Sequence, residues 1–141
     1  MARLAYAKTI GSGSGEGDGQ FRGIRGVDVD EEHIVACDWQ ANSVSLFSKA
    51  TGAFVRKFGS EGSGQGQFRG PFGLRLAGGN VYVCDYVNNR VQVLTKEGVF
   101  VRFIGDVSGH GEVRSPTSVA VDDEHVVVSS LIIWAIVVFR S

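Results

Sequence analysis

The chain has 141 residues, of which 43% are hydrophobic, and a formal net charge of −1 at pH 7. These values indicate one folded domain and exclude the strong overall basic bias of a dedicated nucleic-acid binder, while a local basic patch remains compatible with them. The most apolar stretch, residues 126–139, is too short to span a bilayer, and the N-terminus lacks the apolar core of a signal peptide. We therefore expect a soluble protein that makes no membrane contact.

The first predicted element is residues 5–11, Ala-Tyr-Ala-Lys-Thr-Ile-Gly, which align with two later segments ending at Gly59 and Gly105. Those segments have the pattern of the last strand of a repeated unit. Residues 5–11 are therefore predicted to be an outer strand whose inner strands do not precede it. A Gly/Ser-rich run at 11–19 follows and recurs after both glycines, so we interpret it as a surface loop between units.

Repeated units follow this loop. The run Gly-Gln-Phe-Arg-Gly at 19–23 returns 47 residues later at 66–70, and a third start, Gly-Glu-Val-Arg-Ser, lies at 111–115. The predicted units are residues 19–59, 66–105 and 111–139. Self-similarity at a fixed spacing of this size is typical of repeat architectures, in which each unit is one supersecondary structure.

The central unit contains four short extended patterns rich in Val, Phe and Tyr, which is the signature of β-strands. They cover residues 73–76, 81–84, 90–94 and 99–104. The connectors hold Gly, Asn and Asp, which tolerate the backbone angles of tight hairpins. Four antiparallel strands in about 45 residues match one blade of a propeller. The predicted fold is therefore all-β, a partial β-propeller with about three four-stranded antiparallel blades.

The third unit departs from this pattern. Ser129 and Ser130 replace a Cys-Asp pair, and the apolar run 131–134 stands where a tight turn is expected, so we predict that the turn is lost there. Three blades are fewer than the usual four to eight. We interpret the chain as a piece of a longer propeller; the alternative is that two chains form a six-bladed ring, each lending its N-terminal strand. In isolation, the chain is expected to self-associate through residues 131–139.

The central unit resembles an NHL repeat. The resemblance is carried by Pro-Phe-Gly-Leu at 71–74, Asn-Val-Tyr-Val-Cys-Asp at 80–85, Asn-Asn-Arg-Val-Gln-Val at 88–93 and Gly-Val-Phe-Val-Arg at 98–102. It extends over nearly the whole chain, in two good copies and one degraded copy. The resemblance implies a propeller, usually of six blades, that binds proteins or RNA. Such propellers are best known as the substrate-recognition part of tripartite-motif ubiquitin ligases, and they also occur in a copper- and zinc-dependent amidating lyase and in bacterial receptor kinases.

In a propeller, the loops between blades and the turns after each second strand emerge on one face. The predicted binding residues on that face are Arg22, Arg25, Trp39, Arg69, Phe72, Tyr86 and Asn88. Aromatic and Arg side chains dominate protein interfaces, and they also stack on unpaired RNA bases. The expected function is a non-catalytic module for a protein partner, in particular substrate recognition for a ubiquitin ligase. Single-stranded RNA binding is the alternative, and an enzymatic propeller ranks last. The alternative that Phe72 and Tyr86 only cover the blade junction, and that the arginines are solvated, stays open.

A second set of polar residues is predicted to be structural. Asp38 and Asp85 begin equivalent turns, where a carboxylate accepts backbone N–H groups. Arg90 is expected to tie its turn to a neighbouring carboxylate, and Asn42 and Asn89 belong to the same turns.

The sequence predicts no catalytic residue, no metal site and no cofactor. His33 and His125 fall on different blades and His110 in a glycine-rich loop, so the three cannot converge as zinc ligands must. Cys37 and Cys84 occupy equivalent places on neighbouring blades, about 10 Å apart, which is beyond disulfide reach. Two buried thiols favour a reducing compartment, so we expect a cytoplasmic protein.

Overall fold

The structure is a computed structural model that describes residues 3–105 and 113–140. The described residues form thirteen strands and no helix. None of them therefore belongs to a helix that could cross a membrane. This architecture confirms the all-β prediction.

Eleven of these strands form three antiparallel sheets, which we call blades 1, 2 and 3. Blade 1 consists of β1 (Ile24–Val29), β2 (His33–Asp38), β3 (Ser43–Ser48) and β4 (Phe54–Phe58). Blade 2 consists of β7 (Pro71–Ala77), β8 (Asn80–Asp85), β9 (Arg90–Thr95) and β10 (Phe100–Gly105). Blade 3 consists of β11 (Pro116–Val121), β12 (His125–Ser130) and β13 (Ala135–Arg140). In each blade the strands pair in sequence order, so every blade is a meander joined by tight turns.

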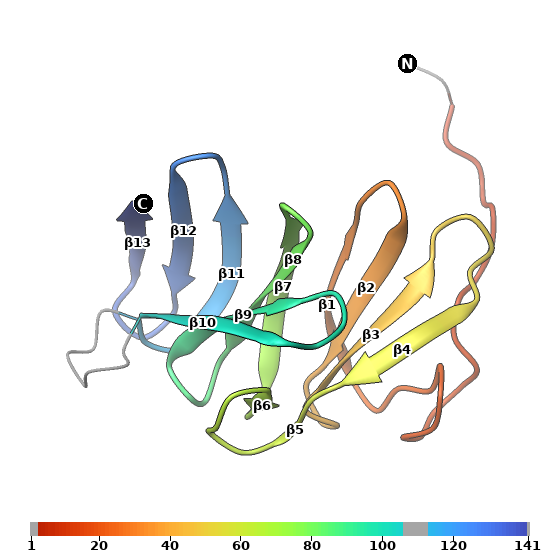
Figure 1. Cartoon of the computed structure of the whole chain (residues 1–141), viewed down its shortest axis with the longest axis horizontal. Helices are drawn as coiled ribbons and strands as arrows, with labels where there is room; N and C mark the ends of the chain where they lie inside the picture. Colours follow the sequence, from red (N-terminus) through yellow and green to blue (C-terminus); the bar gives the residue numbers. More distant parts are fainter. Residues whose placement is uncertain (1–2, 106–112, 141) are drawn as a thin grey trace.

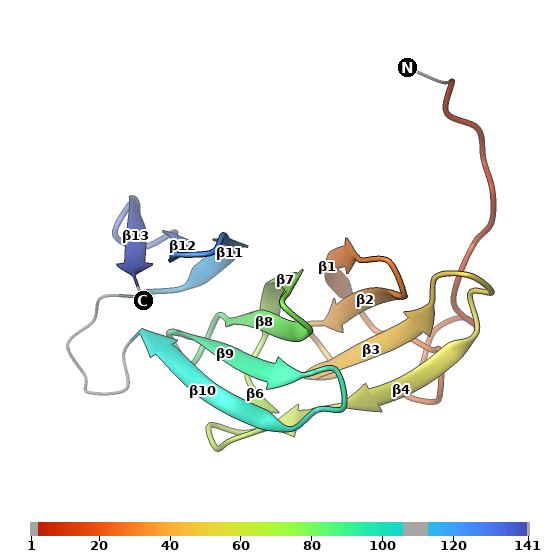
Figure 2. The same cartoon turned by 45° about the horizontal axis from the view of Figure 1, so that its top comes forward.

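The blades stand side by side in an open arc, with blade 1 and blade 3 at its two ends (Figures 1 and 2). Each first strand lies next to the first strand of the neighbouring blade, so that β1 contacts β7 and β7 contacts β11. This arrangement is that of consecutive propeller blades. A short parallel pair, β5 (Ser60–Glu61) with β6 (Gln67–Phe68), lies in the loop between blades 1 and 2. The sequence did not predict this pair.

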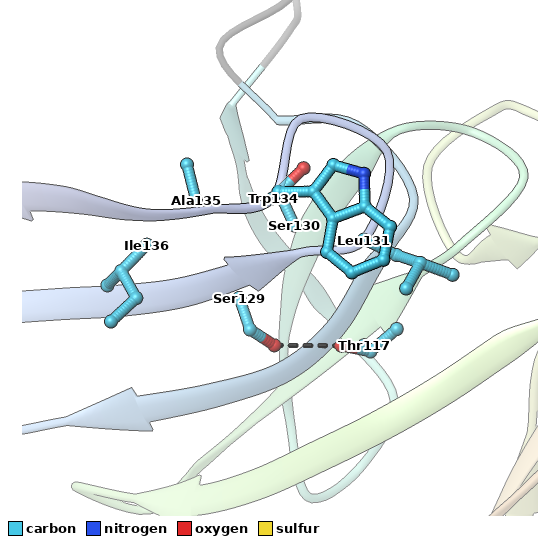
Figure 3. A pocket seen from close by; sticks show the side chains of 7 residues that line it. All are labelled: Thr117, Ser129, Ser130, Leu131, Trp134, Ala135 and Ile136. Atoms are coloured by element: carbon cyan, nitrogen blue, oxygen red, sulfur yellow. Dashed lines mark hydrogen bonds between the residues drawn. The ribbon is translucent and has the colours of Figure 1, made fainter.

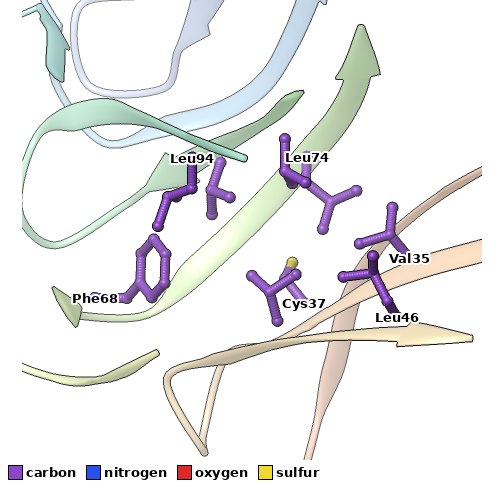
Figure 4. Packing of buried hydrophobic residues seen from close by; sticks show 9 residues of the cluster. Val35, Cys37, Leu46, Phe68, Leu74 and Leu94 are labelled. Atoms are coloured by element: carbon purple, nitrogen blue, oxygen red, sulfur yellow. The ribbon is translucent and has the colours of Figure 1, made fainter. Parts of the chain in front are cut away.

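The hydrophobic core lies between the blades. One cluster fills the junction of blades 1 and 2 and includes Val35, Cys37, Leu46, Phe68, Leu74 and Leu94 (Figure 4). The second fills the junction of blades 2 and 3 and contains Cys84, Val91, Val113, Val119 and Val128. Both faces of blade 2 are therefore buried, which explains why β8 carries bulky residues at successive positions rather than alternating with polar ones. Each fully buried Val or Leu contributes about 1.5–3 kcal/mol.

Glycine allows the inner strands to approach closely. A Cβ atom on Gly73 would lie 2.3 Å from the carbonyl oxygen of Thr117 in blade 3. A Cβ atom on Gly26 would lie 3.0 Å from the carbonyl oxygen of Phe72 in blade 2. A side chain at Gly73 would therefore force β7 and β11 apart.

Two expectations about the ends of the chain need correction. Residues 5–11 were expected to form a strand, but they form none here, because no neighbouring strand offers hydrogen bonds to them. The turn between β12 and β13 was expected to be lost, but residues 131–134 keep it, with Trp134 in the left-handed region at φ 53°. The start of the third repeat and His110 lie outside the described residues.

Candidate interaction surface

The buried carboxylate of Asp38 organises the loops of blade 1. It accepts hydrogen bonds from the backbone N–H groups of Gln40 and Ala41 in its own turn, at 3.2 and 3.1 Å. It also accepts the N–H groups of Arg22 (2.7 Å) and Gly23 (3.0 Å), which belong to the loop that enters the blade. Asp38 is therefore a structural turn residue, as predicted, and it additionally fixes the loop that carries Arg22.

The carboxylate of Asp85 organises the loops of blade 2 in the same way, but it also pairs with a charged side chain. Its carboxylate accepts the Arg69 N–H at 2.8 Å and the Nε–H of Arg90 at 2.9 Å. Burial raises the pKa of Asp85, and the hydrogen bonds from Arg69 and Asn88 and the charge of Arg90 oppose that increase. The predicted link between Arg90 and a neighbouring carboxylate is confirmed.

Arg90 is itself enclosed by its blade. Its guanidinium donates to the carbonyl oxygens of Ser63 (2.6 Å), Gly64 (3.1 Å) and Gln67 (3.1 Å). It also lies 4.0 Å from the ring centroid of Phe103. A guanidinium with this many partners belongs to the scaffold and is not presented to a ligand.

Asn42 and Asn89 join each blade to the next one. Both adopt positive φ angles, 54° and 55°, which asparagine tolerates in tight turns. The Asn42 side-chain oxygen accepts the N–H of Gly70, and that of Asn89 accepts the N–H of Ser115, both at 2.9 Å. These residues act as structural turn residues.

Four of the predicted binding residues form a continuous row across blades 1 and 2, which we call the aromatic row. The guanidinium of Arg25 lies 5.1 Å from the ring centroid of Trp39 and 5.4 Å from that of Phe72. Phe72 in turn stacks on Tyr86, with centroids 5.4 Å apart and an angle of 28° between the rings. The three aromatic side chains are partly exposed, and Arg25 is exposed.

The aromatic row also has a packing role. A Cβ atom on Gly70 would lie 3.2 Å from the indole of Trp39, so this ring lies against the loop of the next blade. Trp39 therefore covers the junction of blades 1 and 2 and still presents part of its surface.

Arg22 and Arg69 flank the aromatic row on the loops that enter the two blades. Both are exposed, and Arg22 pairs with Glu16 at 3.5 Å. Such an exposed pair contributes little to stability, so it leaves the Arg22 side chain available to a partner.

Asn88, which was expected on the binding surface, lies half-buried in the turn between β8 and β9 and bonds to neighbouring residues there. Its amide nitrogen donates to the carbonyl oxygen of Gly62 and to the carboxylate of Asp85, both at 2.9 Å. Because these bonds use both hydrogens of the amide, we assign Asn88 to the scaffold.

The histidines in the described residues have other partners. His33 Nδ1 lies 3.2 Å from Lys96 Nζ, and His125 pairs with Asp122 in its own turn at 3.2 Å. Within residues 3–105 and 113–140, no three His, Cys, Asp or Glu side chains gather into a group that could hold a metal ion. Cys37 and Cys84 are free, and burial raises the pKa of each thiol to about 12.

One contact could not be expected from the sequence. Lys96, in the β9–β10 turn, forms an ion pair with Asp30, in the β1–β2 turn, and so joins blade 2 to blade 1. Burial favours a higher pKa for Asp30, but Lys96 and the N–H groups of His33 and Glu32 outweigh it and lower this pKa to about 2.

Solved structures with this arrangement of strands are β-propeller proteins. Hydrazine synthase from Kuenenia stuttgartiensis matches 83% of this chain over 34% of its own, with a TM-score of 0.63 and 15% identity. A catalytically inactive virginiamycin B lyase from Staphylococcus aureus with quinupristin matches 84% over 41%, with a TM-score of 0.59 and 12% identity. Glutaminyl cyclase from Myxococcus xanthus matches 90% over 55%, with a TM-score of 0.56 and 18% identity. At these identities the likeness concerns the fold alone.

The chain spans about a third to just over a half of the length of these structures. A comparison with curated protein sequences finds no match. The blades and these neighbours define a segment of a β-propeller. The family model of the NHL repeat matches residues 68–94, which run from β6 through β9. Within this propeller segment, residues 68–94 are thus one NHL repeat.

Proposed function

We propose that this chain is a non-catalytic interaction module that binds a protein partner through the aromatic row and its flanking arginines. The observation that carries the proposal is the row itself, in which Trp39, Arg25, Phe72 and Tyr86 form one partly exposed stack across two blades. Aromatic and Arg side chains on rigid loops are the groups that contribute most to protein interfaces, because they bury a large area for a small loss of freedom.

The arginines define the chemistry of the partner. Arg22, Arg25 and Arg69 place three positive charges around the aromatic row, and one of them is paired with Glu16. A segment that carries acidic side chains beside an apolar or aromatic residue complements this surface. If the chain serves as the substrate-recognition part of a ubiquitin ligase, this surface selects the substrate, and the catalytic domains lie outside residues 1–141.

A pair of matched double variants tests the proposal. Arg25→Ala with Arg69→Ala removes one charge from the aromatic row and one from its flank, whereas Arg56→Ala with Arg102→Ala removes two from the exposed strands β4 and β10. We expect proteins that co-precipitate with the unaltered chain to be depleted at least about tenfold by the first pair and retained by the second. Thermal melting of both variants checks that they are folded. Equal retention by the two pairs would contradict the proposed surface.

Single-stranded RNA binding is the second candidate, because the stacked pair of Phe72 and Tyr86 beside Arg25 also suits unpaired bases. It predicts submicromolar binding of a fluorescein-labelled oligouridine, measured by anisotropy at low salt. The affinity should fall as salt rises, with a slope of about −0.7 for each phosphate contact. A flat titration at low salt removes this candidate and leaves the protein-binding proposal intact.

A further inference from the structure

The two ends of the arc expose apolar side chains that a soluble sheet normally covers. At one end, Ile136 and Val138 on β13 are 72% and 58% exposed. At the other end, Val27 and Val29 on β1 are 66% and 53% exposed. We call these the β13 face and the β1 face.

The β13 face is equivalent to a face that is buried elsewhere in the molecule. By register with the preceding strand, Ile136 and Val138 correspond to Val44 and Leu46 of blade 1. Both residues of blade 1 are 0% exposed, because the next blade covers them. The β13 face therefore has the form of a surface onto which another blade packs.

The β1 face has the complementary form. Val27 and Val29 correspond in register to Leu74 and Leu76 of blade 2. Leu74 is 7% exposed, and Leu76 packs against the same cluster, because both are turned toward blade 1. The two exposed faces are thus the two halves of a junction that the molecule already makes between blades 1 and 2.

Among the described residues, blade 3 has one strand fewer than blades 1 and 2. β4 and β10 are the outer strands of blades 1 and 2, whereas β13 is the outermost strand of blade 3. A hollow of about 460 Å³ lies here and is lined by Trp134, Ile136 and their neighbours. Figure 3 shows these side chains, with Ser129 hydrogen-bonded to Thr117. A fourth strand and a further blade would cover these side chains.

Residues 5–11 have the sequence of such an outer strand. Counted back from their last glycine, the three segments carry an aromatic residue, a basic residue and an apolar residue at the same positions. These positions are Tyr6, Lys8, Ile10 and Gly11; Phe54, Arg56, Phe58 and Gly59; and Phe100, Arg102, Ile104 and Gly105. The three glycines share similar positive φ angles of 114°, 106° and 104°.

The loop that follows supports the same equivalence. Gly17 N–H donates to Gln20 Oε1 at 3.0 Å, as Gly64 N–H does to Gln67 Oε1 at 3.0 Å after β4. The loop after Gly11 is therefore built like the loop after an outer strand. Yet the segment before it is unpaired, and Tyr6 is 82% exposed.

We propose that a second copy of this chain docks head to tail on the β13 face with its β1 face, and that its residues 5–11 pair with β13 as the fourth strand of blade 3. The N-terminal segment of the same copy lies beside blade 1, at the opposite end of the arc from β13, and does not pair with it (Figures 1 and 2). Two copies related by a twofold axis form two such junctions and close a ring of six blades.

The register of the exchanged strand follows from the other blades. Phe58 pairs with Val44 in blade 1, and Ile104 pairs with Val91 in blade 2. The equivalent partner of Ile136 is therefore Ile10 of the second copy.

The oligomeric state of the chain of residues 1–141 tests the docking. Light scattering at tens of micromolar should give a particle of two 15.1 kDa chains. Ile136→Lys with Val138→Lys should convert it to a monomer. The matched control, Val55→Lys with Val99→Lys, changes exposed valines of β4 and the β9–β10 turn and should leave the dimer unchanged. A monomeric unaltered chain overturns the proposal, as does a dimer that survives the β13 substitutions.

Disulfide trapping tests the strand exchange separately. Chains carrying Ile10→Cys are mixed with chains carrying Ile136→Cys, with oxidised glutathione as the oxidant, and the mixed covalent dimer is identified by its mass. Native Cys37 and Cys84 are buried and do not compete. The neighbouring Thr9→Cys variant, whose side chain points to the other face of the strand, should cross-link at least about tenfold more slowly. Absence of the Ile10–Ile136 product, or equal rates for the two pairs, overturns the strand exchange.

Discussion

Blades 1 and 2 use an aspartate at the same position of the repeat, but the two carboxylates have different partners. Asp38 is satisfied by backbone N–H groups alone, whereas Asp85 also pairs with the buried guanidinium of Arg90. The position of Arg90 is taken in blade 1 by Ser43, whose buried hydroxyl has no hydrogen-bond partner among the described residues. One residue difference therefore changes a turn held by backbone N–H groups into one that also depends on an ion pair.

This difference predicts unequal costs for the same substitution. Asp85→Asn leaves the Arg90 charge buried without its counter-charge, and it should lower the free energy of unfolding by about 3 kcal/mol. Asp38→Asn keeps an acceptor oxygen for neutral N–H groups and should cost about 1 kcal/mol. Urea denaturation of both variants at pH 7 measures the two losses. Equal losses would show that the ion pair is not what distinguishes the blades.

The sequence predicts these turn residues because they recur at fixed places in the repeat. The sequence pattern does not show that both amide hydrogens of Asn88 are used, here by Gly62 and Asp85. The pair of Asp30 and Lys96 was missed for a related reason. The two residues lie 66 positions apart on different blades, and only the packing of the blades brings them together.

At the scale of elements, the β12–β13 turn shows that the strands impose the shape of their connection. Its sequence lacks the Gly, Asn or Asp that tight turns prefer, and yet the paired strands hold it in place. Trp134 takes the left-handed position that Asn89 occupies in blade 2. A bulky residue there is strained by about 1–2 kcal/mol.

Replacing Trp134 with Gly should therefore stabilise the chain. The side chain is 88% exposed, so its removal loses little burial, and glycine adopts the positive φ without strain. We expect a gain of about 1 kcal/mol in the free energy of unfolding, measured by urea denaturation. Asn89→Gly at the equivalent position is the control and should give no gain, because it deletes the acceptor for Ser115. A destabilised Trp134→Gly variant would contradict the assignment of strain.

At the scale of the whole molecule, the number of blades and the order of strands were predictable, because the repeat and its alternating strands specify each blade separately. The predicted strand at residues 5–11 was not found, since a strand needs a neighbour and the sequence does not show where that neighbour lies. What holds the arc together is instead the set of contacts between blades. The pair of Asp30 and Lys96 is one of them.

This pair makes the junction of blades 1 and 2 sensitive to acid. The pKa of Asp30 is about 2 in the folded chain and near 3.8 without these contacts. Its contribution is therefore complete above about pH 4 and is lost as the pH falls toward 2, and the partly exposed position limits it to about 1 kcal/mol. Urea denaturation between pH 2 and 6 should show this loss in the unaltered chain, whereas Asp30→Asn removes this part of the acid dependence. Lys96→Met should have the same effect, and additive effects of the two changes would contradict a shared contact.

Each junction between blades contains one cysteine, whose chemical reactivity can report on the opening of that junction. Cys37 is sealed between blades 1 and 2, with its sulfur 3.4 Å from the carbonyl oxygen of Phe72, and Cys84 belongs to the cluster between blades 2 and 3. With thiol pKa values of about 12, neither reacts while it stays covered. The rate at which an alkylating reagent modifies Cys37 therefore measures how often the junction of blades 1 and 2 opens. The rate at Cys84 measures the opening of the junction of blades 2 and 3. The two rates, measured on one unaltered protein, show which junction opens more readily.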